Sequence, residues 1–133
     1  MVTKDGFERL SAFRYQLRRF LRFSEDVCQA EGVSMLQYQL LLHTQGFEGR
    51  EWASISELAE RLQAKPHGVV ALVDRCEQAD LVRRKVNADD KRLVEVHLTA
   101  HGRRVIQKLA TVHRKEVRRF AEVVDAVDPV ASS

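Results

Sequence analysis

A basic segment, residues 83–92, constrains the fold of this chain more than any other stretch. It holds five Lys or Arg against two Asp. It begins inside a strand-like run, Val82–Val86, and ends where a second such run, Leu93–Leu98, begins. The polar residues between the runs, Asn87–Arg92, are then expected to form the tip of a β-hairpin. A cationic hairpin tip is suited to lie against a phosphate backbone.

Two short amphipathic helices are predicted just before this hairpin. Ser54 and Glu57 are spaced as a capping box at the start of the first. Residues 63–65 make a tight turn, and Pro66 suits the first turn of the second helix, where its missing N–H costs nothing. Asp80 is expected to end that helix, because Asp tolerates the left-handed backbone conformation better than most residues. Two helices followed by a hairpin predict a winged helix-turn-helix.

One face of the second helix and the hairpin are the surfaces that we expect to meet DNA. Apolar residues at 69, 72, 73 and 76 recur at helical spacing and mark the buried side of that helix. The opposite side and the hairpin carry the residues predicted to contact DNA: Lys65, His67, Gly68, Ala71, Arg75, Arg84, Lys85 and Lys91. Replacing Arg84 or Lys85 is expected to weaken binding to all sequences alike.

Longer amphipathic helices are predicted at both ends of the chain. The first runs from Phe7 to near residue 31, and the last from a Thr99 cap almost to Pro129. A helix capped by Ser34 and a short strand at 52–53 lie between the first helix and the helix-turn-helix. Leaving long apolar stripes in water would cost about 1.5–3 kcal/mol per large side chain. We therefore expect residues 1–33 and 99–133 to dimerise around a DNA-binding unit at 34–98; a monomer with both helices folded back is the alternative.

The bulk properties fit one soluble domain. The chain has 133 residues, 44% of them apolar, and a net charge of +3. No apolar run approaches the length of a membrane span, and the first residues lack the apolar core of a signal peptide, so the prediction is a cytoplasmic protein without membrane contact. With two cysteines a disulfide framework is not expected. Cys76 should pack as a small hydrophobe, and a redox role for Cys28 is the minority interpretation.

Several motifs together resemble the multiple-antibiotic-resistance regulators, the MarR family. Residues 56–62, Ser-Glu-Leu-Ala-Glu-Arg-Leu, resemble its first helix-turn-helix helix, and 72–75, Leu-Val-Asp-Arg, resemble its recognition helix. Asp90 and Arg92 resemble the Asp-x-Arg wing tip, and 98–102 the Leu-Thr-x-x-Gly exit. The resemblance implies a homodimeric repressor or activator that binds pseudopalindromic duplex sites and is released by a small, often phenolic, molecule. It also implies that Arg92 enters the minor groove, held by Asp90.

The sequence departs from the family pattern in three places. Residues 66–71, Pro-His-Gly-Val-Val-Ala, replace the small hydroxyl residues that usually open the recognition helix, so direct base contacts should be few. Asp80 stands where the family usually has Gly. The family's final helix would begin about where this sequence ends, so either the expected dimer interface is smaller than usual or the first and last helices form all of it. An effector pocket is predicted where these helices meet the winged unit, near Phe20, Tyr38, Leu41 and Leu42; packing in the core is the alternative role of each of these residues.

Two other functions stay open at the level of sequence. A metal-responsive regulator could use some of the five histidines, of which His97 and His101 are four residues apart across a strand-to-helix junction. A protein-interaction module could keep the fold without specific DNA binding, as the apolar recognition face would allow. No catalytic motif or cofactor-binding motif is found, so neither an enzyme nor a cofactor is predicted.

Overall fold

The computed structural model describes residues 1–127 and confirms a mainly helical chain with a small β-hairpin wing. Helix α1 begins at Lys4, one turn earlier than predicted, because Thr3 caps it by accepting a hydrogen bond from the Gly6 N–H. Strand β3 begins at Val94, since Leu93 belongs to the hairpin turn. The elements in chain order are α1 (Lys4–Ala30), α2 (Met35–Gln45), β1 (Trp52–Ser54), α3 (Ile55–Leu62), α4 (Pro66–Gln78), β2 (Val82–Val86), β3 (Val94–Leu98) and α5 (Ala100–Val127).

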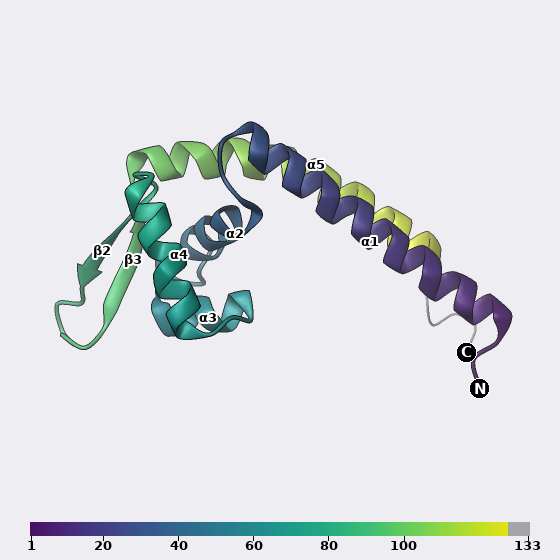
Figure 1. Cartoon of the computed structure of the whole chain (residues 1–133), viewed down its shortest axis with the longest axis horizontal. Coiled ribbons are helices and arrows are strands. Elements are labelled where there is room, and N and C mark those ends of the chain that lie inside the picture. Colours follow the sequence, from purple (N-terminus) through teal and green to yellow (C-terminus); the bar gives the residue numbers. More distant parts are fainter. Residues whose placement is uncertain (128–133) are drawn as a thin grey trace.

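The molecule has a winged unit and a two-helix arm (Figure 1). Elements α2 to β3 pack around one core, with the β2–β3 hairpin projecting beside α4. Helices α1 and α5 lie side by side and extend well beyond this unit. The monomer alternative predicted that both helices fold back over the winged unit, and they do not. Residues 128–133, the last part of the predicted dimerisation segment, lie outside the described residues.

The sheet is antiparallel with the strand order β1-β3-β2. Its register places Trp52, His97 and Arg83 in one row across the three strands, and Ser54, Glu95 and Lys85 in the next. Because side chains alternate along a strand, these two rows share one face, and the other face carries apolar residues into the core. The polar face therefore joins β1, before the helix-turn-helix, to both strands of the wing.

Local capping explains where the helices begin and end. Ser54 and Glu57 form the predicted capping box at the start of α3, and Ser34 forms a second one at the start of α2. Pro66 is the first residue of α4, as predicted. Asp80 adopts a φ of +57°, so the turn before β2 keeps its left-handed conformation without glycine.

The junction between β3 and α5 is unusually close. Only Thr99 separates the two elements; its N–H donates to the Leu81 carbonyl at 3.0 Å, and its Oγ1 accepts from the Gly102 N–H at 3.0 Å. A Cβ atom on Gly102 would lie 2.0 Å from the Leu81 carbonyl oxygen. Position 102 must therefore be glycine for α5 to approach the entry to β2 this closely.

Within residues 1–127, none of the helices is both long and apolar enough to cross a lipid bilayer.

Candidate nucleic-acid interface

The first part of the interface is the outer face of α4. Val69, Leu72, Val73 and Cys76 are buried, which confirms the predicted inward stripe. The α4-side residues predicted to contact DNA are all exposed: Lys65, His67, Gly68, Ala71 and Arg75. Few side chains on this face can make bidentate base contacts, so His67, Arg75, backbone groups and DNA shape would carry much of any recognition there.

The second part is the wing, whose tip presents an ordered arginine. Lys85, Lys91 and Arg92 are exposed, and the Arg92 side chain is 93% accessible. The Asp90 carboxylate accepts hydrogen bonds from the Arg92 N–H at 3.0 Å and from its Nε at 3.2 Å. Asp90 thus orients the side chain through Nε, the guanidinium nitrogen nearest the backbone, while the group as a whole stays exposed to solvent. This is the contact that the resemblance implied.

Arg84 has surroundings different from those of the other basic wing residues. Its guanidinium lies 2.6 Å from Asp74 and 2.6 Å from Glu77, both on α4, and the side chain is 27% exposed. Two carboxylates already neutralise it, so its predicted role as a phosphate ligand does not suit this position. Arg84 instead ties the wing to α4. The i, i+3 spacing of Asp74 and Glu77 was the signal in the sequence, since it puts both carboxylates on one side of the helix.

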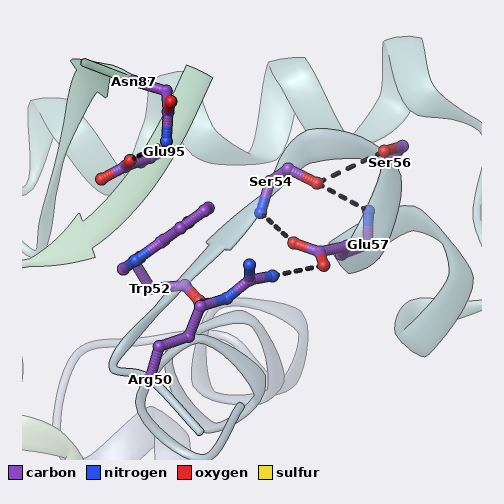
Figure 2. Close-up of polar contacts among 7 residues, drawn as sticks. All are labelled: Arg50, Trp52, Ser54, Ser56, Glu57, Asn87 and Glu95. Carbon is purple, nitrogen blue, oxygen red and sulfur yellow. Dashed lines mark hydrogen bonds and ion pairs between the residues drawn. The ribbon is translucent and has the colours of Figure 1, made fainter. Parts of the chain in front are cut away.

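A cation–aromatic cluster lies in the loop between α2 and β1, next to the start of α3. The Arg50 guanidinium sits 3.8 Å from the Trp52 ring centroid and 4.3 Å from that of Phe47. It also forms an ion pair with Glu57, whose other carboxylate oxygen accepts the Ser54 N–H at 2.8 Å (Figure 2). Glu57 thus completes the cap of α3 and anchors the preceding loop at once.

Glu57 gives this cluster a pH dependence that can be measured. Burial alone would raise the pKa of Glu57, but hydrogen bonds from Ser54 and Arg50 outweigh it and hold the pKa below its ordinary value. Because the pKa of Glu57 is lower in the folded state than in the unfolded state, its ionised carboxylate stabilises the fold at any pH above the unfolded-state pKa. This stabilisation is lost as the pH falls through the folded-state pKa. Glu57→Gln should therefore cost about 1 kcal/mol at pH 7 and progressively less below about pH 4.5.

Urea melts of both proteins between pH 7 and pH 3 measure this difference in unfolding free energy. Glu60→Gln, an exposed change on the same helix, is the matched control and should show no such convergence. A Glu57→Gln penalty that stayed constant down to pH 3 would contradict the assignment.

The four residues of the predicted effector pocket are divided between core and surface. Tyr38 and Leu41 are buried, and the Tyr38 ring stacks on His113 at 4.3 Å. Leu42 is 38% exposed. Phe20 alone of the four lines a cleft of about 400 Å³ between α1 and α5, whose other lining residues are Gln16, Arg19, Phe23, Glu116, Arg119, Phe120 and Val123. The α5 half of this cleft was not predicted, because helical periodicity does not reveal which two helices pair.

The described residues offer neither a metal site nor a reactive thiol. Within the described residues, no group of three or more His, Cys, Asp or Glu side chains is arranged to hold a metal ion. His97 hydrogen-bonds to Glu95, and buried His113 hydrogen-bonds to Ser24 at 2.8 Å. Burial raises the pKa of the Cys76 thiol to about 11 and also raises that of Cys28. Neither thiol has the depressed pKa of a reactive cysteine.

Comparison with known proteins gives consistent matches to one family. Residues 31–93 match the MarR family model. The chain is 42% identical over 48 residues to the transcriptional repressor MdtR of Bacillus subtilis, an alignment that covers 36% of this chain and only 31% of MdtR. Among solved structures, the MarR family regulator AbsC of Streptomyces coelicolor superposes with a TM-score of 0.78 at 26% identity, over 98% of this chain and 95% of AbsC.

A more distant structure shares the fold alone. A point mutant of S. aureus MepR, bound to an oligodeoxyribonucleotide, superposes with a TM-score of 0.64 at 19% identity, over 83% of this chain and 79% of MepR. The family model covers the helix-turn-helix and most of the wing, and the likeness to AbsC extends to both arm helices. The chain is thus similar to the MarR family of transcriptional regulators over residues 31–93, and it shares the fold of a MarR family regulator over nearly its whole length.

Proposed function

We propose that this chain is a homodimeric repressor that binds pseudopalindromic duplex DNA and is released by a small aromatic, phenolic ligand. Its place of action would be the cytoplasm, in contact with the DNA. Residues 34–98 would read DNA, and residues 1–33 and 99–133 would form the dimer. DNA binding is the part of the proposal with the most direct support, and the dimer and the ligand build on it.

The observation that carries the proposal is the pairing of an exposed cationic wing with the exposed face of α4. Arg84 joins the two through Asp74 and Glu77, so the wing and the helix keep a fixed relation. Arginine suits a narrow, electronegative minor groove, and the adjoining helix suits the major groove. In the distant relative MepR, the same fold is seen bound to an oligodeoxyribonucleotide.

The dimer is supported by the apolar surface of the arm. Phe7, Leu10 and Tyr15 on α1 and Val117 on α5 are between 44% and 60% exposed. A two-helix arm that projects into solvent with such a surface favours a partner, and a second copy offers the same surface by two-fold symmetry. A dimer would also place two recognition helices about one turn of duplex apart.

Charge on the arm should break this dimer. We expect the double variant Leu10→Glu, Val117→Glu to raise the dimer dissociation constant at least about a hundredfold, because each large apolar side chain contributes about 1.5–3 kcal/mol when buried. Sedimentation equilibrium measures the change. Leu36→Glu, at a 52% exposed position on α2 outside the arm, is the matched control and should leave the dimer intact. If the native chain sediments as a monomer, the dimer is excluded.

The ligand part of the proposal rests on the cleft between α1 and α5. Phe20 and Phe120 stack at 5.2 Å in its wall, and Arg19 and Arg119 lie among its lining residues. Phenyl rings beside guanidinium groups suit a flat aromatic molecule that carries a hydroxyl or carboxylate group. Because both arm helices form the cleft, a bound ligand would change how they pack.

The second candidate function, a protein-interaction module, is favoured by the apolar character of α4. Val70 is 40% exposed beside Gly68 and Ala71. Selection of duplexes from a library of random sequences separates the two functions. A repressor should bind its selected duplex with an affinity on the order of a thousand times that for unrelated competitor DNA. Failure to enrich any sequence would exclude the specific DNA-binding function and leave the interaction module.

A further inference from the structure

The polar face of the wing contains a nearly buried carboxylate. The Glu95 side chain on β3 is only 10% exposed. Its Oε2 accepts a hydrogen bond from Asn87 Nδ2 at 2.6 Å, and its Oε1 accepts one from His97 Nε2 at 2.7 Å. Figure 2 shows Asn87 and Glu95 directed toward each other across the hairpin. Burying a carboxylate is unfavourable unless it is hydrogen-bonded, and here both oxygens are.

The hydrogen bonds continue from Glu95 to the wing tip. Because the Asn87 amide N–H faces Glu95, its Oδ1 faces the turn, where it accepts the backbone N–H groups of Asp89 and Asp90, each at 2.9 Å. Asp90 in turn accepts hydrogen bonds from the Arg92 N–H and Nε. One series of contacts therefore runs from a buried strand position to the exposed arginine.

We propose that Glu95, acting through Asn87, is a positioning residue that orders the wing tip and orients Arg92 for DNA. The inference rests on the proposed function, because orienting Arg92 matters for binding only if the wing contacts a DNA duplex. Its physical basis is preorganisation: a long side chain that is already oriented loses less conformational entropy on binding. Glu95 itself does not reach the DNA.

The charge state of Glu95 suits this role. The hydrogen bond from His97 lowers the pKa of the Glu95 carboxyl, with smaller contributions in the same direction from Asn87 and from Lys85, its register partner on β2. Glu95 is therefore an ionised acceptor at neutral pH, and a charged acceptor makes a stronger hydrogen bond to the amide of Asn87 than a neutral one. A valine at this strand position would favour the sheet equally well and would give Asn87 no acceptor.

A thermodynamic cycle tests whether Glu95 acts through Arg92. Glu95→Val and Glu95→Gln are made in the native chain and in the Arg92→Ala background, and affinity for the duplex selected from the random library is measured by fluorescence anisotropy. In the native chain, Glu95→Val should weaken binding about fivefold to tenfold, and Glu95→Gln, which keeps an acceptor for Asn87, should retain most of the affinity. In the Arg92→Ala background, Glu95→Val should change nothing. An equal loss in both backgrounds, or no loss in either, overturns the proposal.

A second measurement needs no DNA. Heteronuclear NOE values of the backbone amides at 89–92 should fall in Glu95→Val and in Asn87→Ala, while those of α4 stay as in the native chain. Tip amides that keep native values in both variants overturn the proposal. Asn87→Ala preserves the strands, so it tests the same link if Glu95→Val does not fold. Absence of a selected duplex would refute the proposed function, whereas unchanged tip order would refute the role of Glu95.

Discussion

Arg92→Ala should weaken binding to a selected duplex by about 1–3 kcal/mol, or roughly tenfold to more than a hundredfold. The side chain is 93% exposed and is held by Asp90 through Nε, so its removal takes away a cation without disturbing the core. Fluorescence anisotropy on wild-type protein and variant measures the loss. Sedimentation of the variant should match wild type, since the wing tip lies far from the arm (Figure 1).

Lys85→Ala provides the comparison for this variant. Lys85 is an exposed cation on β2, below the tip, where phosphate contact would be independent of sequence. Its loss should reduce the affinity for all duplexes by a similar factor and flatten the salt dependence. Should Arg92→Ala bind as tightly as wild type, the wing would have no part in DNA binding.

Gly102→Ala should destabilise the fold by about 3 kcal/mol, at the upper end of the cost of overpacking. The added Cβ would lie 2.0 Å from the Leu81 carbonyl oxygen, and backbone atoms cannot move aside as a flexible side chain would. Relief of this contact requires α5 to shift away from the start of β2, which breaks the hydrogen bond between Thr99 and Leu81. Denaturant melts monitored by circular dichroism report the loss.

Gly68→Ala is the matched control for Gly102→Ala. Gly68 also lies in the first turn of a helix, but apart from its chain neighbours and the backbone of its own helix nothing lies within 4 Å of a Cβ built there. Alanine at position 68 should stabilise the chain by up to about 1 kcal/mol, because it restricts the unfolded backbone. If both substitutions changed the free energy of unfolding equally, the contact with Leu81 would not be the reason that Gly102→Ala is destabilising.

The elements were predictable because their signals are local. The capping box of Ser54 and Glu57, Pro66 at the start of α4 and the left-handed Asp80 depend on residues close in sequence. The exposed face of α4 followed from periodicity alone. The family resemblance added the Asp90–Arg92 contact, which spacing could not have supplied.

What the sequence did not disclose depends on how distant elements meet. Arg84 looked like any other basic wing residue until the fold placed it between two carboxylates of α4. Arg50 lay in a loop without periodicity, and its stacking between Phe47 and Trp52 depends on the path of that loop. The partners of Glu95 depend on the strand register and on the shape of the turn. The hydrophobic pattern predicts only which face of the sheet a residue lies on, not which residue lies beside it.

The one-residue connection at Thr99 makes the wing and the arm mechanically continuous. Rotation there would break the hydrogen bonds to Leu81 and Gly102 together, so the strand and the first turn of the helix are expected to move together. A tilt of the start of α5 would therefore move the hairpin with it. In the proposed dimer, the spacing between the two wings would then depend on how the arms cross.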